Sequence, residues 1–262
     1  MRNIKIVVEY DGTGYHGWQS QVNANTVQGV LGDAVRRITG ENCGIIGASR
    51  TDVGVHAVGQ VANFITGSKI PVERFPQALN SALPDDIVVK AAEEVGLDFH
   101  STYSANGKRY RYLIHNSPFP SALLRHRAFH VTQPLDVDAM QEACRHFLGT
   151  HDFSAFRASG SRVKTSERTI FEVSVRKRGD GSAASQGDNG TVPPFLPVLV
   201  EFEILGSGFL YNMVRIIAGT LAEVGAGKRS PGDMPAIIES RDRKKAGKTA
   251  PAHGLYLVEV YY

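Results

Sequence analysis

The loop between two predicted strands, Cys43–Ser49 and Val58–Thr66, holds the residues best suited to chemistry. Asp52 is a lone carboxylate there, Arg50 precedes it by two residues, and Gly54 allows a tight turn. A nearby guanidinium lowers the pKa of a carboxyl group, so Asp52 should stay ionised, which suits a nucleophile better than a general acid. An aspartate that only accepts backbone N–H groups in an Asx turn is the alternative.

Two glycine-rich motifs resemble phosphate-binding loops, but their context argues against that function. Gly12–Gly17 fits the dinucleotide pattern GxGxxG, yet Trp18–Gln21 does not open an apolar-periodic helix that could direct its N-terminus at a pyrophosphate. Gly225–Ser230 resembles the end of a P-loop, but Arg229 stands where a magnesium-binding hydroxyl is needed. We therefore expect no nucleotide cofactor.

Metal and disulfide chemistry are also weakly supported. His126 and His130 are spaced like a ligand pair on a helix, but their segment has no carboxylates. Cys43 and Cys144 are the only cysteines, too few for a disulfide framework or a thiolate metal site. We expect no metal ion and two free thiols.

Basic residues are distributed unevenly along a chain whose net charge is only +3. The segment Phe99–Leu135 has no acidic residue. It contains Lys108, Arg109, Arg111, Arg125 and Arg127, with His100, His115, His126 and His130. A second acid-free segment, Phe153–Ser166, combines Arg157, Arg162 and Lys164 with two phenylalanines. Such a mixture is typical of nucleic-acid binding, although a solvated basic face is the simpler explanation.

The composition favours a soluble globular protein with one large or two modest domains. The 262 residues are 42% hydrophobic and 21% charged. No apolar run approaches the roughly 20 residues of a membrane span. The N-terminus shows no secretory signal, so we expect a cytoplasmic protein without a membrane partner.

Hydrophobic periodicity predicts two halves, residues 1–100 and 101–262, that mix strands and helices in a similar order. The first half includes the strand Ile4–Tyr10, a helix that Thr26 caps and Gly40 ends, a short helix near Pro71, and the strand Ile87–Ala91. In the second half the predicted strands are Lys108–His115, Thr169–Lys177, Leu199–Leu205 and Leu255–Tyr261, and the helices are Val137–Leu148 and Asn212–Val224. This order suggests an α+β fold, a duplicated unit with one shared, mainly antiparallel sheet. Gly179–Pro194 is predicted to be a mobile loop.

The segment Arg50–Ala57 (RTDVGVHA) resembles the nucleophile motif of the TruA family of tRNA pseudouridine synthases, and the resemblance extends along nearly the whole chain. The other matching segments are Tyr10–Gln19 (YDGTGYHGWQ), Thr26–Gln28 (TVQ), Leu83–Val89 (LPDDIVV), Gly107–Asn116 (GKRYRYLIHN), His151–Phe156 (HDFSAF), Gly208–Arg215 (GFLYNMVR) and Ala250–Leu257 (APAHGLYL). The resemblance implies the pseudouridine synthase fold, two α+β halves with a central basic cleft.

The resemblance also assigns roles to individual residues. It implies that Asp52 is the catalytic aspartate and that Arg215 is its ion-pair partner. It implies that Tyr110 stacks on the target uracil and that Arg50 enters the space left by the flipped nucleotide. Gly254–Leu255 would form part of the wall of the uridine pocket. From its strand position alone, Tyr110 could equally be a core residue, as we expect for Tyr112.

The implied function is that of an isomerase acting on tRNA, as a homodimer that modifies uridines 38–40 of the anticodon stem-loop without a cofactor. A non-catalytic tRNA-binding module and a synthase for a different RNA uridine are the alternatives.

One position departs from the family. Thr102 stands where the family usually has an arginine, which leaves one phosphate or structural contact in doubt.

Overall fold

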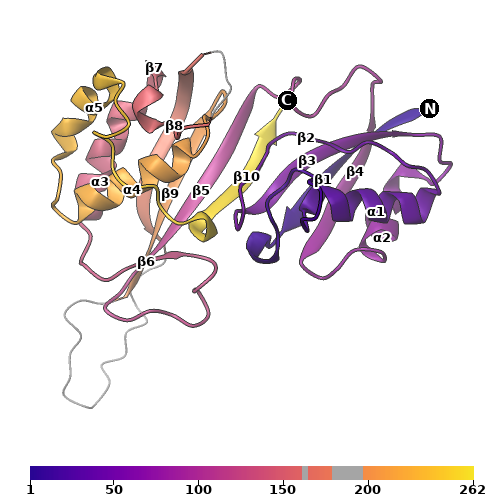
Figure 1. The fold of residues 1–262 in the computed structure, drawn as a ribbon, viewed down its shortest axis with the longest axis horizontal. Coiled ribbons are helices and arrows are strands. Elements are labelled where there is room, and N and C mark those ends of the chain that lie inside the picture. Colours follow the sequence, from indigo (N-terminus) through magenta and orange to yellow (C-terminus); the bar gives the residue numbers. More distant parts are fainter. Residues whose placement is uncertain (161–164, 179–196) are drawn as a thin grey trace. The chain divides into compact units, whose positions relative to one another are not determined.

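Strand β1 (Arg2–Tyr10) buries every second side chain from Ile4 to Tyr10, as its alternating sequence predicts. The computed structural model describes residues 1–160, 165–178 and 197–262. Within these residues the chain forms two units (Figure 1). The first unit comprises Met1–Lys108 and Tyr256–Tyr262, and the second comprises Arg109–Leu255. The chain therefore returns to the first unit for its last seven residues.

The strands of the first unit are ordered β4-β1-β3-β10. Strand β1 pairs antiparallel with β3 (His56–Thr66) on one side and with β4 (Ile87–Val95) on the other. The two-residue strand β2 (Ile46–Gly47) pairs antiparallel with β3. The end of β10 (Leu255–Tyr261) adds a parallel pairing to β3. The long strand β3 thus follows the Asp52 loop and pairs with β2, which precedes it.

Two helices accompany these strands, and Figure 1 shows them together on one side of the first unit. Helix α1 (Val27–Thr39) begins where Thr26 accepts a hydrogen bond from the Gly29 N–H, and it ends at Gly40 with φ +74°. Both ends agree with the sequence prediction. Helix α2 (Phe75–Asn80) is shorter and has proline in its first turn.

The second unit orders its strands β5-β9-β8-β7, with β6 paired to β5. The bounds are β5 (Gly107–Asn116), β6 (Phe129–Val131), β7 (Gly149–Asp152), β8 (Glu167–Arg178) and β9 (Val198–Gly206). Its helices are α3 (Val137–Cys144), α4 (Met213–Gly225) and α5 (Met234–Ser240). Figure 1 shows these three helices grouped on one side of β8 and β9, and α3 packs against both α4 and β8. Helix α4 is almost completely buried and forms the centre of this core.

Several predicted elements differ from the structure in extent. The strand expected over Cys43–Ser49 is reduced to the two residues of β2, and the helix expected to reach Leu148 ends at Cys144, before a turn of 3₁₀ helix. The short elements β6, β7 and α5 were not predicted. The predicted mobile loop Gly179–Pro194 lies outside the described residues. Mixed strands and helices with mainly antiparallel pairing confirm the α+β class.

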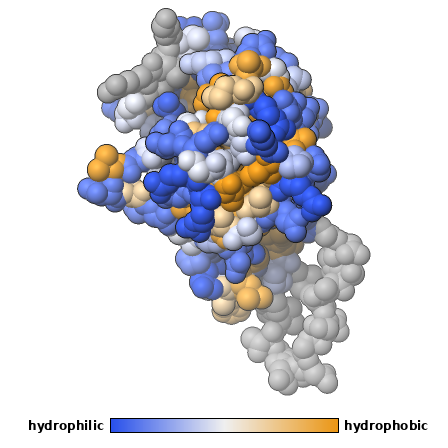
Figure 2. Space-filling view, turned by 90° about the vertical axis from the view of Figure 1, so that its right-hand side faces the viewer, coloured by the Kyte–Doolittle hydropathy of each residue, from blue (hydrophilic) through white to orange (hydrophobic). Residues whose placement is uncertain are grey.

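The surface of the first unit is mostly polar on the side that faces the viewer in Figure 2, with a band of hydrophobic residues across it. Apolar atoms contribute more than half of an ordinary protein surface, so this band indicates no partner by itself. Among the described helices, none is long and apolar enough to span a bilayer.

Candidate active site

Asp52 lies at a tight turn between β2 and β3. The Val55 N–H donates to the Asp52 carbonyl over 3.1 Å, and Gly54 has φ +77°, a conformation that L-residues rarely adopt. Thr51 before the turn is buried, whereas Asp52 is half-buried and Val53 is exposed. The predicted role of Gly54 is therefore confirmed, and the half-buried Asp52 stands next to a buried residue on a tight turn.

The strand leading into this turn is fastened by side chains from distant parts of the chain. Gln60 is fully buried, and it accepts from the Ser49 N–H (3.2 Å) while its amide donates to the Ser49 carbonyl (2.8 Å). Lys108 Nζ donates to the Ala48 carbonyl over 2.6 Å. Burial lowers the pKa of Lys108 from 10.5 to about 8. Lys108 therefore supports the loop rather than presenting its charge to a phosphate.

Thr102 supports the same strand at Gly47, one residue before the Ala48 carbonyl that Lys108 binds. Its hydroxyl donates to the Gly47 carbonyl over 2.8 Å. At Thr102, where we expected a departure from the family pattern, a short hydroxyl makes a structural contact with β2. This contact gives the departure from the family pattern a physical role.

The glycine-rich segment after β1 packs directly against the Asp52 turn. The Trp18 N–H donates to the Thr51 carbonyl over 3.0 Å. A Cβ atom on Gly17 would lie 2.5 Å from that same oxygen, and Gly17 also has φ +83°. A Cβ on Gly12 would overlap the Val55 carbonyl. Two of the three glycines of this pattern, Gly12 and Gly17, therefore allow a close approach of two backbones.

In the second unit, Arg215 is held by hydrogen bonds at the start of α4. Its Nε donates to the Ala250 carbonyl (2.8 Å), and its Nη1 donates to Asn212 Oδ1 (2.7 Å). The Ala250 N–H in turn donates to the Arg215 carbonyl over 3.1 Å. Asn212 adopts φ +60°, which asparagine tolerates better than most residues. Asn212 was not predicted to support the site. An asparagine at the start of a helix could have indicated such a role, because asparagine often occupies the N-cap position.

The segment after Ala250 is fixed against Tyr112. The Tyr112 hydroxyl donates to the Pro251 carbonyl over 2.7 Å, and a Cβ on Gly254 would lie 2.6 Å from Tyr112 Cζ. Tyr112 is fully buried, which confirms it as a core residue. Burial raises the pKa of the Tyr112 phenol, and the charge of Arg215 acts in the opposite direction. Arg215 and Gly254 are thus parts of one packed arrangement, and glycine is required at 254 because the tyrosine ring fills the space.

Tyr110 occupies the same strand two residues before Tyr112. Its side chain is 8% exposed, and its ring meets Phe209 edge to face with centroids 5.2 Å apart. This contact fixes the ring plane of Tyr110.

Two arginines of the basic segment Phe99–Leu135 have acidic partners. Arg109 Nη2 lies 2.7 Å from a Glu172 carboxylate oxygen, and Arg111 Nη2 lies 2.7 Å from Glu203 Oε1. Arg111 Nε also lies 3.1 Å from Glu201, which is 2% exposed. The segment Phe99–Leu135 contains no acidic residue, but the neighbouring strands β8 and β9 of the second unit supply carboxylates that pair with its arginines. Arg162 and Lys164 lie outside the described residues.

The structure distributes the candidate residues over the two units. Asp52 and the exposed Arg50 belong to the first unit. The second unit contains the buried Tyr110, the half-buried Arg215, and the buried pair Gly254–Leu255 at the start of β10. In each unit the functional candidates lie on backbone that is fixed by contacts with neighbouring segments.

The first unit thus holds a carboxylate and the second a guanidinium, each on fixed backbone, and preorganised groups of both kinds are suited to stabilising charge. The model of the tRNA pseudouridine synthase family matches residues 6–104 and 143–262. The chain therefore belongs to the tRNA pseudouridine synthase family. Pseudouridine synthases are isomerases, so the enzyme class expected from the sequence is confirmed, as is the pseudouridine synthase fold.

Curated relatives match over the full chain. Proteins named tRNA pseudouridine synthase A from Acetivibrio thermocellus, Ruminiclostridium cellulolyticum and Thermoanaerobacter sp. are 61%, 52% and 50% identical, each match covering 100% of both chains. The two blocks of the family match contain Arg50, Asp52, Arg215, Gly254 and Leu255, whereas Tyr110 lies between the blocks.

Proposed function

We propose that the protein converts uridine to pseudouridine at positions 38–40 in the anticodon stem-loop of tRNA. The observation that supports this most strongly is the Asp52 turn, a half-buried carboxylate on a rigid base in a chain of the tRNA pseudouridine synthase family. A non-catalytic tRNA-binding module would not need the carboxylate on so constrained a turn. The choice of positions 38–40 comes from the family resemblance.

The reaction is an isomerisation, so all atoms of the substrate are kept. The N1–C1′ glycosidic bond breaks, the uracil turns, C5 bonds to C1′, and the C5 proton leaves while N1 gains one. One carboxylate is sufficient because no water has to be activated, unlike in glycosidases that use two. Asp52 would add to the sugar C1′ or to C6 of the base, or would assist elimination at the sugar.

Arg215 is the proposed partner of Asp52. Its Nε and one Nη bind Ala250 and Asn212, which leaves the orientation of the guanidinium determined before substrate arrives. A guanidinium paired with a carboxylate keeps it ionised and oriented. Arg215 is thus a positioning residue for the ionised form of Asp52.

The uridine must leave the stacked stem before it can react, because a paired base hides the glycosidic bond. We assign Arg50, exposed two residues before Asp52, to the space that the flipped nucleotide leaves. We assign Tyr110 to stacking on the uracil, with Gly254 and Leu255 in the wall of the uridine pocket. The homodimer and the cytoplasmic location remain expectations from the sequence.

The direct test uses tRNA transcribed with tritium at C5 of uridine. Each conversion releases one tritium to water, so release measures turnover independently of binding. Matched transcripts in which uridine 38, 39 or 40 is replaced by cytidine would map the position. We expect release that is lost only when these uridines are replaced. Release that persists in a transcript lacking all three would point to a different uridine, and binding without release would favour the non-catalytic alternative.

A further inference from the structure

A pocket of about 330 Å³ lies within the second unit, between the β5 end, β6 and the turn before β10. Its lining residues are His115, Pro120, Ser121, Leu124, Arg125, Ala128, Phe129, His130 and His253. None of them is acidic, and none is among the candidate residues for the uridine site. The volume is near the lower end of the roughly 300–1,000 Å³ that small-ligand pockets span. We call it the His115 pocket.

Two neighbouring histidines, His115 and His130, line one side of the His115 pocket. The rings of His115 and His130 lie with centroids 5.6 Å apart and planes 31° apart. His130 Nε2 lies 2.8 Å from the Ser117 carbonyl, which only accepts, so this nitrogen carries the proton. Burial and the neighbouring His130 lower the pKa of His115. The lowered pKa favours the uncharged ring of His115, and the two neighbouring rings offer an aromatic surface for stacking.

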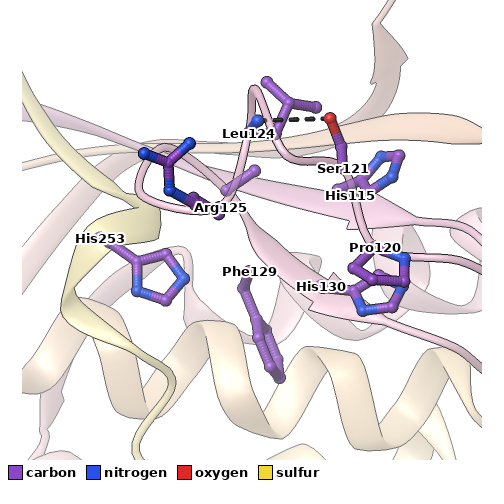
Figure 3. Close-up of a pocket in the computed structure, with 9 residues that line it drawn as sticks. His115, Pro120, Ser121, Leu124, Arg125, Phe129, His130 and His253 are labelled. Carbon is purple, nitrogen blue, oxygen red and sulfur yellow. Dashed lines mark hydrogen bonds between the residues drawn. The ribbon is translucent and has the colours of Figure 1, made fainter.

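The charge of the pocket is supplied by Arg125. Its Nη1 donates to the Ala122 carbonyl over 2.6 Å, which anchors the guanidinium while its other N–H groups remain to be used by a ligand. Figure 3 shows Arg125 and His253 toward one side of the pocket, His115 and His130 toward the other, and the Phe129 ring beneath them. The pocket thus has a cationic side and an aromatic side.

We propose that the His115 pocket binds one unpaired nucleotide of the tRNA substrate, other than the target uridine. Its base would stack against the imidazole and Phe129 rings, and its phosphate would bind Arg125. His253 directly precedes Gly254, so the pocket adjoins the segment that we assign to the uridine site. Most of the lining lies between the two blocks of the family match, at residues 115–130. The inference rests on the proposed function for the identity of the RNA.

Proton NMR of the imidazole rings tests nucleotide binding directly. The chain has nine histidines, and His115→Gln and His130→Gln assign the two signals of interest. The probes are the four nucleoside 5′-monophosphates and ribose 5-phosphate at millimolar concentration. We expect nucleotides to shift both signals, and ribose 5-phosphate to shift them much less. Unmoved signals, or equal shifts with the sugar phosphate, would overturn the proposal.

Variants test the same pocket with tRNA. Phe129→Leu and Arg125→Gln should each weaken tRNA binding about fivefold or more, because a stacked base and a phosphate contact are lost. Phe171→Leu on β8 and Arg145→Gln after α3 are matched controls, since both side chains are exposed and neither lines the pocket. Thermal melting confirms that the variants fold.

The outcomes separate this inference from the proposed function. If wild-type protein releases tritium while Phe129→Leu and Arg125→Gln bind tRNA as tightly as their controls, the pocket assignment is wrong and the function stands. If wild-type protein releases no tritium, the function fails, and nucleotide-dependent shifts of His115 and His130 still decide whether the pocket binds a nucleotide.

Discussion

The two units fix their candidate residues by different physical means. Around Asp52, the backbone is packed so closely that a Cβ atom on Gly17 would have no room. The Gln60 side chain also binds both the backbone N–H and the carbonyl of Ser49. Around Arg215, the functional group itself is held, through bonds from its guanidinium to Ala250 and Asn212. The first unit thus positions a short side chain through its backbone. The second positions a long side chain at its tip, because the position of a short carboxylate follows from its Cα, whereas an arginine has four rotatable side-chain bonds to restrain against two in aspartate.

The largest expected effect, apart from loss of Asp52, comes from removing the guanidinium. Arg215→Met should slow tritium release at least about 100-fold while tRNA binding changes much less, because the variant loses the group that we propose keeps Asp52 ionised and oriented. Single-turnover release and filter binding measure the two effects, with Arg145→Met as control. Thermal melting must accompany them, since Ala250 and Asn212 also lose a partner. Normal turnover would remove Arg215 from the proposed site.

Tyr110 and Tyr112 lie on the same strand, β5, and variants of the two should separate a catalytic role from a structural one. Tyr110→Phe keeps the ring and removes the hydroxyl, so it should retain tRNA affinity and slow release by roughly tenfold or more if the phenol assists removal of the C5 proton. Tyr112→Phe should instead lower the free energy of unfolding by about 1 kcal/mol, because it loses the bond to the Pro251 carbonyl. Full activity of Tyr110→Phe would limit Tyr110 to stacking.

Glycine substitutions test the packing below Asp52. Gly17→Ala should reduce kcat/KM about tenfold and destabilise the fold by about 1–3 kcal/mol, because the methyl group meets the Thr51 carbonyl and alanine disfavours φ +83°. Gly14→Ala is the matched control, since a Cβ there meets nothing within 4 Å. Equal behaviour of the two variants in kinetics and urea unfolding would contradict the role given to this close approach.

The smallest expected effect concerns Lys108 and pH. An unfolded lysine keeps its proton to about pH 10.5, whereas folded Lys108 loses it near pH 8. Between these values the unfolded chain binds more protons, so this group makes the free energy of unfolding rise with pH. Burial also raises the pKa of Cys144 and of Tyr262 to about 12, which opposes the rise above about pH 9.

Comparison with a variant isolates the contribution of Lys108. From pH 8 to pH 10, the free energy of unfolding of the wild type should rise by about 1–2 kcal/mol relative to that of Lys108→Met. Urea unfolding at several pH values measures it. A difference that does not vary with pH would show that Lys108 titrates as an exposed lysine.

Local signals in the sequence predicted much of this molecule. The caps of α1 and the turn at Gly54 depend on residues within a few positions of one another, and both are confirmed. The hydrogen bonds from Thr102 and Lys108 to the strand before Asp52 were not predicted. Their partners are distant in sequence, since Gly47 lies 55 residues before Thr102 and Ala48 lies 60 residues before Lys108. The ion pairs of Arg111 were missed for the same reason, since Glu201 and Glu203 lie 90 and 92 residues further along the chain, on a neighbouring strand.

Asp52→Asn is the measurement that tests the central claim most directly. The amide keeps the size and nearly the shape of the side chain but removes its negative charge, so a catalytic carboxylate would be lost while an Asx turn would survive. We predict that Asp52→Asn binds tRNA and melts like the wild type but releases no tritium in a single turnover. Asp33→Asn, an exposed carboxylate on α1, should release tritium normally. Normal release by Asp52→Asn would contradict the proposed mechanism.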